Sequence, residues 1–478
     1  MAVTDRTPEQ WRDVLLLELA MRRPALLTHS AYYEGDHPLP RAPKAAREAY
    51  SRFLRQSRSN WVQLVVDAVA ERLQVVGFRF GATEADDADA WLIWQANHLD
   101  ADAELAQTDA LTCGVSYLSV WPDERSPVGV TIAPEHPLQT IVAFDPERRR
   151  RRAASLKAWT EPDRAMCWVA TAEFSAVWQA PNAGGEGEFL ATAAWDLAGD
   201  VVENPLGDVP IVELRPWPLT RPLLAGEIPG RSEMDGIVDI QDRINTTVFN
   251  RLIASEYASF RQRWATGLEL KTKRDPATGE EILDPITGEP IAVSPYDAAV
   301  DRLWVAEDGN VAFGEFGESD LAGYIKGAES DIQMLAAITK TPPHYLLGSI
   351  VNASGDALKA AETGLVSKVR RRAAHLGEGL EEVMRLAFTA LGDARAVDVS
   401  AEVIWADFET RSEGERVDAL TKMSILRVPD EVLWQKWGAS PQEVGRWKAM
   451  AADAALIAAL AGGGEPVRPP PGPPVPAA

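Results

Sequence analysis

Apolar residues near the start of the chain repeat every three or four positions, the spacing of an amphipathic helix. The first run begins with Thr7, Pro8 and Gln10, which match a capping box with proline at the first helical position. The apolar residues Trp11, Leu15 and Leu19 follow at helical spacing. Further helices are predicted at 43–56, 60–73, 85–97 and 101–112.

Beyond Gly114 the apolar period shortens toward two, which indicates strands separated by turn residues. The predicted strands are 115–121, 128–133, 138–144, 154–159, 174–178 and 209–217. Residues 1–230 are therefore expected to form one large mixed α/β domain.

A long helix is predicted at 231–260, with Ser232 and Asp235 as candidates for its N-cap. Its apolar residues fall on one face: Ile237, Ile240, Ile244, Val248 and Leu252. Three acids fall on the opposite face: Asp235, Asp239 and Asp242. A metal site and a solvated acidic stripe are both conceivable there, and the stripe is favoured because no histidine or further acid completes a ligand shell.

A second helix is predicted at 319–339, capped by Ser319. Its apolar stripe comprises Leu321, Ile325, Ala328, Ile332 and Leu335. The opposite face comprises Gly323, Lys326, Gly327, Ser330 and Met334. A glycine inside a helix costs about 1 kcal/mol relative to alanine, so the two glycines indicate close approach of another backbone or a smooth lining, unless they are tolerated surface positions.

The segment between these helices, 261–318, is predicted to be a small β module. It contains the repeat DPATGE (275–280) and DPITGE (284–289), in which proline fixes φ and glycine admits positive φ. The strand-like runs 302–306 and 310–316 flank Asp308-Gly309, a hairpin signal.

Pro342-Pro343 must end the second helix, because proline lacks the amide donor. A loop, KTPPHYLLGSIVNASG (340–355), carries Lys340 and His344. A long helix then begins after Ser354 and runs to Leu391, with Gly377 and Gly379 as possible bends. A strand at 397–408, short helices to about 461 and the proline-rich tail GGGEPVRPPPGPPVPAA complete the chain.

Composition narrows the class of protein. With 478 residues, two or more domains are expected. The net charge of −23 should repel duplex DNA over most of the surface, although it is also explained by simple solubility. The arginine run 148–152 lies at a predicted hairpin tip, where it either contacts DNA or an acidic neighbour or is a solvated loop. In a second run, 370–372, the side chains point in different directions, which favours salt bridges.

No catalytic motif is present: the sequence lacks a phosphate-binding loop, HExxH, GxSxG and a complete GxGxxG. Cys113 and Cys167 have no CxxC spacing, and the histidines are scattered. No secretory signal or membrane-spanning run is seen. We therefore expect a soluble protein made in a reducing cytoplasm, with no cofactor, no metal and no enzymatic activity.

Several segments resemble portal proteins (head-to-tail connectors) of tailed bacteriophages, and in particular those of actinobacterial phages. They are AYYEGDHPLP (31–40), NWVQLVVDAVAERLQVVGFRF (60–80), NPLGDVPIVEL (204–214), GRSEMDGIVDIQDRINTTVFNRLIASEYASFRQRWATG (230–267) and SGDALKAAETGLVSKVRRR (354–372). The resemblance covers roughly residues 5–450. The DPxTGE repeat and the proline-rich tail are not features of the family that we can place.

The resemblance implies an α+β portal fold. Its parts would be a wing (1–230 and 357–408), two stem helices (231–260 and 319–339), a clip (261–318), a tunnel loop (340–356), a helical crown (409–461) and a tail (462–478). It further implies a dodecameric ring at one capsid vertex, assembled in the host cytoplasm. Double-stranded DNA would pass through the ring. The partners implied are the large terminase subunit, a head-completion or adaptor protein, tail, capsid and scaffolding proteins, and no membrane.

Three sets of residues are candidates for these roles. The stem-packing set is Ile237, Ile240, Ile244, Val248, Leu252, Leu321, Ile325, Ile332 and Leu335, expected to lie between neighbouring subunits. The channel-facing set is Lys326, Ser330, Lys340 and His344. The clip set for partner binding is Asp275, Thr278, Glu280, Asp284, Thr287 and Glu289. The alternatives are another structural virion protein, such as a minor head protein, and a nucleic-acid-processing packaging enzyme.

Overall fold

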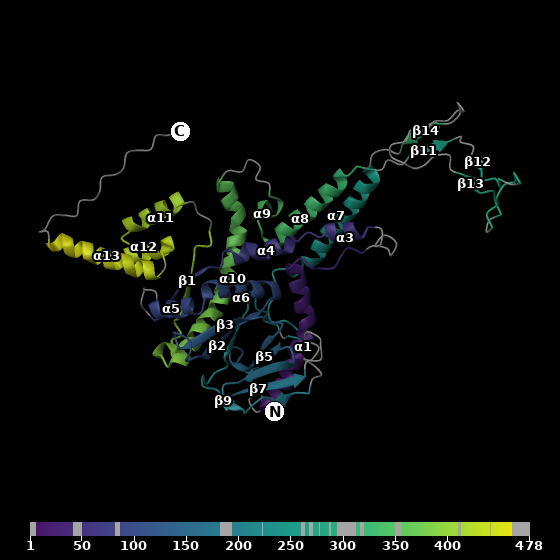
Figure 1. Ribbon diagram of the computed structural model, residues 1–478. Helices are drawn as coiled ribbons and strands as arrows, with labels where there is room; N and C mark the ends of the chain where they lie inside the picture. Colours follow the sequence, from purple (N-terminus) through teal and green to yellow (C-terminus); the bar gives the residue numbers. More distant parts are fainter. Residues whose placement is uncertain are drawn as a thin grey trace, which may run out of the picture. The chain divides into compact units, whose positions relative to one another are not determined.

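The computed structural model is a mixed helix and sheet protein whose chain divides into two compact units (Figure 1). It describes residues 6–41, 50–81, 87–181, 194–221, 223–259, 263–266, 271–276, 278–285, 288–293, 312–315, 320–348, 355–409, 413–439 and 441–460. The first unit comprises Met1–His37, Asn60–Val238 and Leu335–Ala478, and the second comprises Pro38–Ser59 and Asp239–Met334. The expected α+β class is confirmed.

Helix α1 (Pro8–Tyr33) opens the first unit, and its capping box is confirmed. The Thr7 amide donates to Gln10 Oε1 over 3.1 Å, and Thr7 Oγ1 accepts from the Gln10 amide over 3.3 Å. These two bonds satisfy donors that the first helical turn leaves free.

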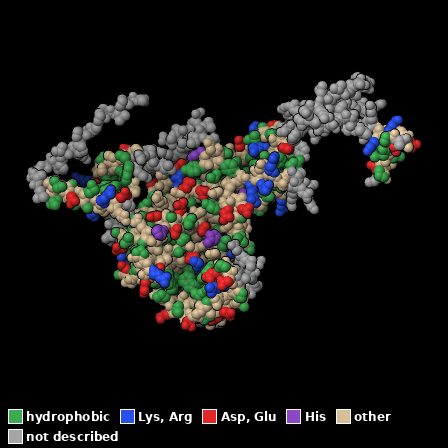
Figure 2. Space-filling model, viewed as in Figure 1, with side chains coloured by type: hydrophobic (Ala, Val, Ile, Leu, Met, Phe, Trp, Pro, Cys, Tyr) green, Lys and Arg blue, Asp and Glu red, His purple; other side chains and the backbone are tan. Residues whose placement is uncertain are grey.

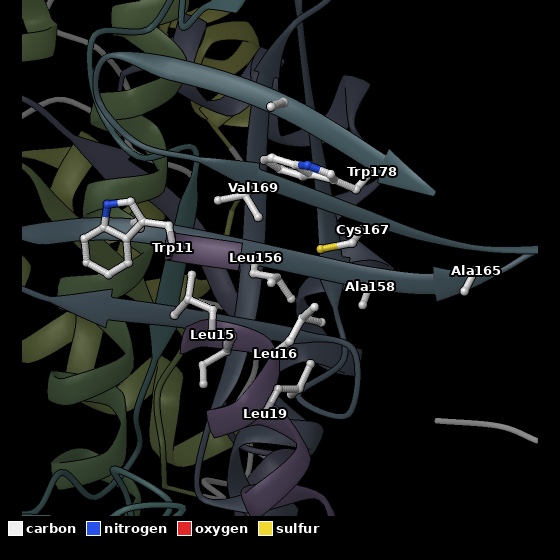
Figure 3. Close-up of a cluster of buried hydrophobic side chains, with 13 residues drawn as sticks. Trp11, Leu15, Leu16, Leu19, Leu156, Ala158, Ala165, Cys167, Val169 and Trp178 are labelled. Atoms are coloured by element: carbon white, nitrogen blue, oxygen red, sulfur yellow. The ribbon is translucent and has the colours of Figure 1, made fainter. Parts of the chain in front are cut away.

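The buried face of α1 packs on an antiparallel sheet with the order β4-β5-β6-β7-β8, in which β9 also pairs with β7. The strands are β4 (Thr140–Phe144), β5 (Arg152–Thr160), β6 (Arg164–Ala170), β7 (Phe174–Pro181), β8 (Asp196–Leu197) and β9 (Val202–Glu203). Trp11, Leu15 and Leu19 meet Leu156, Val169 and Trp178 in one apolar cluster (Figure 3). Burial of these side chains is the main source of stability for this layer.

A second sheet has the order β10-β2-β3, and a two-stranded pair joins β1 to β15. The strands are β10 (Ile211–Leu214), β2 (Ser116–Pro122), β3 (Val130–Glu135), β1 (Val75–Arg79) and β15 (Glu402–Trp405). Helices α4 (Trp61–Ala70), α5 (Ala88–Ala96) and α6 (Leu99–Cys113) complete this region. The pairing of β1 with β15 brings together segments that are far apart in the sequence.

Helix α10 (Gly355–Leu391) is continuous over 37 residues. Gly377 and Gly379, where a bend was predicted, both lie within this one helix. A Cβ atom at Gly379 would lie 2.4 Å from Leu214 Cδ2, whereas one at Gly377 would find no atom nearer than 3.6 Å. Gly379 therefore allows α10 to approach β10 closely.

The first unit ends with a short 3-10 helix, Ala394–Val397, strand β15 and three helices. These helices are α11 (Glu413–Ile425), α12 (Asp430–Trp437) and α13 (Pro441–Leu460). We call them the terminal helices.

The second unit contains α3 (Ser51–Gln56), α7 (Val238–Ser259) and most of α8 (Ala322–Thr339). Its strands are β11 (Arg263–Thr266), which pairs with β14 (Ala312–Glu315), and β12 (Lys271–Thr272), which pairs with β13 (Ala292–Val293). The predicted β content of this segment is confirmed for these residues.

Most predicted helices and strands are confirmed, with shifts of a few residues at their ends. The N-cap assigned to Ser232 or Asp235 is wrong, because α7 begins at Val238. Ser232 Oγ instead donates to the Thr112 carbonyl over 2.6 Å. Strands β1, β6, β8 and β9 were not predicted. The expectations for Ser319, Ser354, Asp308-Gly309 and the tail lie outside the described residues.

We expect Gly379→Ala to destabilise the first unit by about 1–3 kcal/mol, the usual range for overpacking. The reason is that the added methyl group meets the buried Leu214 side chain. Gly377→Ala is the matched control and should be neutral or stabilising by up to about 1 kcal/mol, since alanine is the better helix former. Chemical denaturation of both variants measures the difference, and equal midpoints would contradict the close approach of α10 to β10.

Candidate functional site

The two long helices of the second unit lie side by side. Arg243 on α7 forms an ion pair with Asp331 on α8 over 2.8 Å. A Cβ atom at Gly327 would lie 3.9 Å from Thr247 Cγ2, whereas one at Gly323 would meet nothing within 4 Å. Neither glycine of α8 is therefore required by a close backbone approach within the described chain, which leaves the lining and surface interpretations open.

A buried polar network fixes α7 to the chain before α4. Asn245 Oδ1 accepts hydrogen bonds from the amide and hydroxyl of Ser59 over 3.0 and 2.8 Å. Gln241 Nε2 donates to the Ser59 carbonyl over 2.7 Å. Phe53 and Leu54 of α3 pack on Phe249 in an adjacent apolar cluster. Buried polar groups that are all paired in this way hold one arrangement of the two segments.

Five of the nine stem-packing candidates are buried within the chain itself, each at most 7% exposed: Ile237, Ile240, Ile244, Ile332 and Leu335. The remaining four are more open: Val248, Leu252 and Leu321 are half-buried, and Ile325 is 43% exposed. The single chain already removes these five residues from water. The place of the stripe between subunits stays a prediction.

The channel-facing candidates lie on or after α8. Lys326, Ser330 and Lys340 are exposed, and His344 is half-buried. Lys340 has a φ of 56°, so this residue turns the chain away from the end of α8 in the left-handed conformation. Helix α9 (Pro343–Leu347) follows, which the sequence pattern had assigned to a loop.

The segment that follows α8 is held by buried and half-buried side chains of the first unit. Lys368 Nζ on α10 donates to the Thr339 carbonyl over 2.9 Å. Arg72 contacts both the Tyr345 hydroxyl, over 2.5 Å, and Glu362, over 3.4 Å. His344 Nε2 lies 3.9 Å from Glu362 Oε1. Residues 339–345 are therefore anchored on α10 and on the end of α4.

One carboxylate lies at the centre of these contacts. Glu233 is paired with Lys368 over 3.1 Å and with Arg372, and the three side chains are nearly inaccessible to water. The Arg372 guanidinium also stacks on Trp217, with 4.3 Å between Cζ and the ring centroid. Burial acts to raise the pKa of Glu233, but the charges of Lys368 and Arg372 outweigh it and leave that pKa below its usual value.

Burial also lowers the pKa of Lys368, although Glu233 acts in the opposite direction. Repulsion from Arg372 and Lys340 adds to the lowering. Two buried cations thus share one carboxylate. The exposed Lys340 is close enough for its charge to act on Lys368. The base of the loop is locally positive in a chain whose net charge is −23.

The chain segment that leads to Glu233 packs against the C-terminal end of α6. The Glu233 amide donates to the Leu111 carbonyl over 2.9 Å. A Cβ atom at Gly230 would lie 2.0 Å from the carbonyl oxygen of Gly114, so only glycine permits this approach of the two backbones.

The two DPxTGE copies adopt the same turn. Gly279 and Gly288 have φ values of 76° and 73°, and their amides donate to the Asp275 and Asp284 carbonyls over 2.8 Å. Thr278, Glu280 and Glu289 are exposed, Asp275 and Asp284 are half-buried, and Thr287 lies outside the described residues. The positive φ that the sequence predicted at the glycines is confirmed.

Three residues spaced by nine positions hold the repeated turns together. Lys273 donates its amide proton to the Ile291 carbonyl, Ile291 donates to Ile282, and Ile282 donates to Lys273, over 2.8, 2.9 and 2.8 Å. The backbone hydrogen bonds of these residues form a closed cycle.

Both arginine runs make salt bridges within the chain. Arg152 is buried and contacts Asp208 and Glu382, each over 2.9 Å, and Arg150 contacts Glu378 over 3.1 Å. Arg370 pairs with Glu409 over 3.1 Å. The salt bridges expected for 370–372 are confirmed at Arg370 and Arg372. In the run 148–152, Arg150 and Arg152 pair with acidic residues of the same chain.

Lys and Arg side chains gather over the helices of the second unit in the view of Figure 2. Arg52 and Arg55 of α3 are exposed there. Sequence periodicity gave no indication of this patch, because α3 is short.

The described residues show no arrangement typical of a catalytic or metal centre. No group of three or more histidine, cysteine, aspartate or glutamate side chains among them could hold a metal ion, and Asp235 lies outside α7. Both cysteines are buried, and burial raises the pKa of Cys113 to about 12, which disfavours the nucleophilic thiolate. In the part of the chain that the structure describes, no helix is long and apolar enough to cross a membrane.

The family described as phage portal protein, SPP1 Gp6-like, matches residues 13–455, so the chain belongs to this family of head-to-tail connector proteins. Its members are structural virion proteins. The portal protein of Mycobacterium phage D29 is 28% identical over 431 residues, covering 86% of this chain and 81% of that protein. The portal protein of Mycobacterium phage L5 is 28% identical over 411 residues, covering 83% and 78%.

Two chains in solved structures of gene transfer agent particles match this chain over most of its length. One, from the neck of an empty particle, has a TM-score of 0.40 and 13% identity, covering 80% of this chain and 90% of its own. The other, from the virion of the native particle, has a TM-score of 0.36 and 13% identity, covering 87% and 95%.

We expect Glu233→Gln to destabilise the first unit by about 3 kcal/mol, because it leaves two buried cations without their counter-charge. The folded pKa of Glu233 is lowered, so its contribution is present above the unfolded value of 4.5 and is lost as the pH falls through the folded value. The difference between wild type and variant in thermal unfolding should therefore shrink on acidification.

Glu378→Gln is the matched control, since Glu378 pairs with an exposed arginine at the surface. An exposed pair contributes about 0–1 kcal/mol. Equal destabilisation by the two substitutions at neutral pH would show that the buried ion pairs stabilise the fold no more than an exposed pair does.

Proposed function

We propose that this chain forms a dodecameric ring at one capsid vertex, through which double-stranded DNA enters and leaves the particle. Membership of the portal family is the observation that carries the proposal. In this proposal α7 and α8 are the stem, the β module between them is the clip, residues 340–356 form the tunnel loop, and the terminal helices form the crown. The rest of the first unit is the wing.

The closure of a ring requires a surface that neighbouring copies share by rotation. With most of the predicted stripe buried inside the chain, the apolar surface left on α8 is Tyr324, Ile325, Met334 and Ile338, which are 36–55% exposed. These residues are the proposed contact between neighbouring stems. Exposed apolar groups gathered on one helix are typical of an interface.

The charge distribution suits a conduit. A net negative chain repels phosphates and avoids trapping the duplex. Lys326 and Ser330 on α8, and Lys340 and His344 after it, would supply the few contacts that centre the DNA. The positive base formed by Lys368 and Arg372 strengthens the attraction at Lys340.

The repeated turns are proposed to contact protein partners. The exposed Thr278, Glu280 and Glu289 would bind the large terminase subunit during packaging and a head-completion or adaptor protein afterwards. Assembly of the ring in the host cytoplasm, with scaffolding and capsid proteins, belongs to the same proposal.

We expect Ile338→Asp to reduce the fraction of rings by tenfold or more, because it places a carboxylate on an apolar contact. Native mass spectrometry of the purified chain measures this fraction. Gln333→Asp adds the same charge at an exposed polar position of α8 and should leave the rings intact. A wild-type chain that stays monomeric at micromolar concentration would contradict the proposal.

We expect the double variant Lys340→Ala and His344→Ala to form rings but to package less DNA and to retain it less well. Loss of the loop cations removes the attraction for phosphate, while the anchors at Thr339 and Tyr345 are unchanged. Nuclease-protected DNA per particle is the measurement. Unchanged packaging and retention would show that the loop contact is unimportant.

A further inference from the structure

The terminal helices enclose an apolar groove that no part of the proposed DNA channel uses. It has a volume of about 500 Å³ and is open to solvent. Its apolar lining comprises Val417, Leu420, Leu433, Trp434, Trp437 and Trp447. Trp434 and Trp447 meet edge to face, with ring centroids 5.7 Å apart and planes at 80°. The groove therefore presents aromatic faces in fixed orientations.

The rim of the groove is polar but its hydroxyl groups are engaged. Thr421 Oγ1 donates to the Val417 carbonyl over 2.7 Å, and Ser424 Oγ donates to the Thr421 carbonyl over 2.9 Å. The lining is therefore mainly apolar and aromatic surface. Aromatic-lined grooves are a common docking site for polyproline segments, whose rings pack on aromatic faces.

The chain carries one such segment after α13. Residues 466–476 read PVRPPPGPPVP and contain several PxxP spacings. They follow Leu460, the last residue of α13, which itself lines the groove through Trp447. Polyproline needs little ordering to bind, because its extended conformation is already favoured in the free chain.

The connection is long enough for the segment to fold back. From Trp447 to Leu460 the helix axis advances about 20 Å at 1.5 Å per residue. Residues 461–468, which include three consecutive glycines, can span up to about 27 Å. Asp418, Asp430 and Glu431 lie near the lining positions in the sequence, and Asp418 and Glu431 are paired with Lys422 and Lys448. Arg468 directly precedes the longest proline run.

We propose that the proline-rich tail, residues 466–476, binds in the tryptophan groove of its own terminal helices. Bound there, it covers apolar surface that would otherwise face water, and it keeps the tail close to α13. The inference stands on the groove and the tail alone and does not depend on ring formation. A free partner with a similar proline-rich motif would have to displace the tail.

A synthetic peptide of residues 465–478 tests the proposal by calorimetry, against the full chain and against a chain ending at Ala461. A tethered tail has an effective concentration in the millimolar range. We therefore expect the shortened chain to bind the peptide at least about tenfold more tightly than the full chain. A peptide with serine at positions 469, 471, 473 and 474 should not bind. Absence of peptide binding to the shortened chain, or equal binding to both chains, overturns the proposal.

Two rim variants of the shortened chain separate the groove from the rest of the surface. Ser424→Arg adds a bulky side chain at an exposed lining position and should weaken peptide binding tenfold or more. Ala449→Arg adds the same side chain at an exposed position of α13 outside the lining and should leave binding unchanged. Equal effects of the two variants would place the peptide elsewhere.

A photo-crosslinker at position 475 of the full chain then tests whether the tail binds its own subunit. Mixing isotopically heavy and light chains before assembly distinguishes the two cases by mass spectrometry. Links from position 475 to α11, α12 or α13 of the same isotope label are expected. Links that join heavy to light chains in statistical proportion would show that the tail binds a second copy, which overturns the assignment to its own helices.

Discussion

The buried ion pair of Glu233 with Lys368 links the two points at which the chain leaves and rejoins the first unit. The chain passes to the second unit after Val238 and returns at Leu335. Glu233 lies just before the departure, and Thr339 lies just after the return. Lys368 contacts both, and Arg372, one helical turn further along α10, holds Glu233 from the other side. Helix α10 therefore contacts the chain just before it leaves the first unit and just after it returns.

The contacts within the second unit bear on the proposed assembly. The network of Gln241, Asn245 and Ser59 and the ion pair of Arg243 with Asp331 give the second unit internal contacts of its own. Neighbouring copies are therefore not needed to cover the main apolar stripe. In the proposed ring, contact between copies would instead depend on the smaller exposed apolar set on α8.

The sequence predicted most of the elements because their signals are local. The capping box at Thr7, the prolines at 342 and 343 and the glycines of the repeated turns each act within a few residues. Strand β6 was missed because its inward residues, Ala165, Cys167 and Val169, are too small to give strong hydrophobic contrast. Strand β1 was missed because it is completed by a partner more than 300 residues away, at β15.

The same reasoning explains what the sequence showed of the candidate site. Lys340 and His344 were selected as candidates because a proline-terminated helix marks the segment that carries them. The anchor below them was not found, since nothing local in the run 370–372 indicates that Arg372 meets Glu233, and Lys368 carries no motif. Partners of this kind are set by how α10 packs on the rest of the first unit. Only the coordinates of the folded chain reveal that packing.

The closed cycle of Lys273, Ile282 and Ile291 has a consequence for how other proteins can recognise the repeated turns. Every backbone amide and carbonyl of these three residues is already used within the cycle. At these positions the module offers no open strand edge on which a foreign chain could add a strand. Recognition there has to rely on side chains that project from the turns, so it is governed by their chemistry and can change by point substitution without altering the backbone.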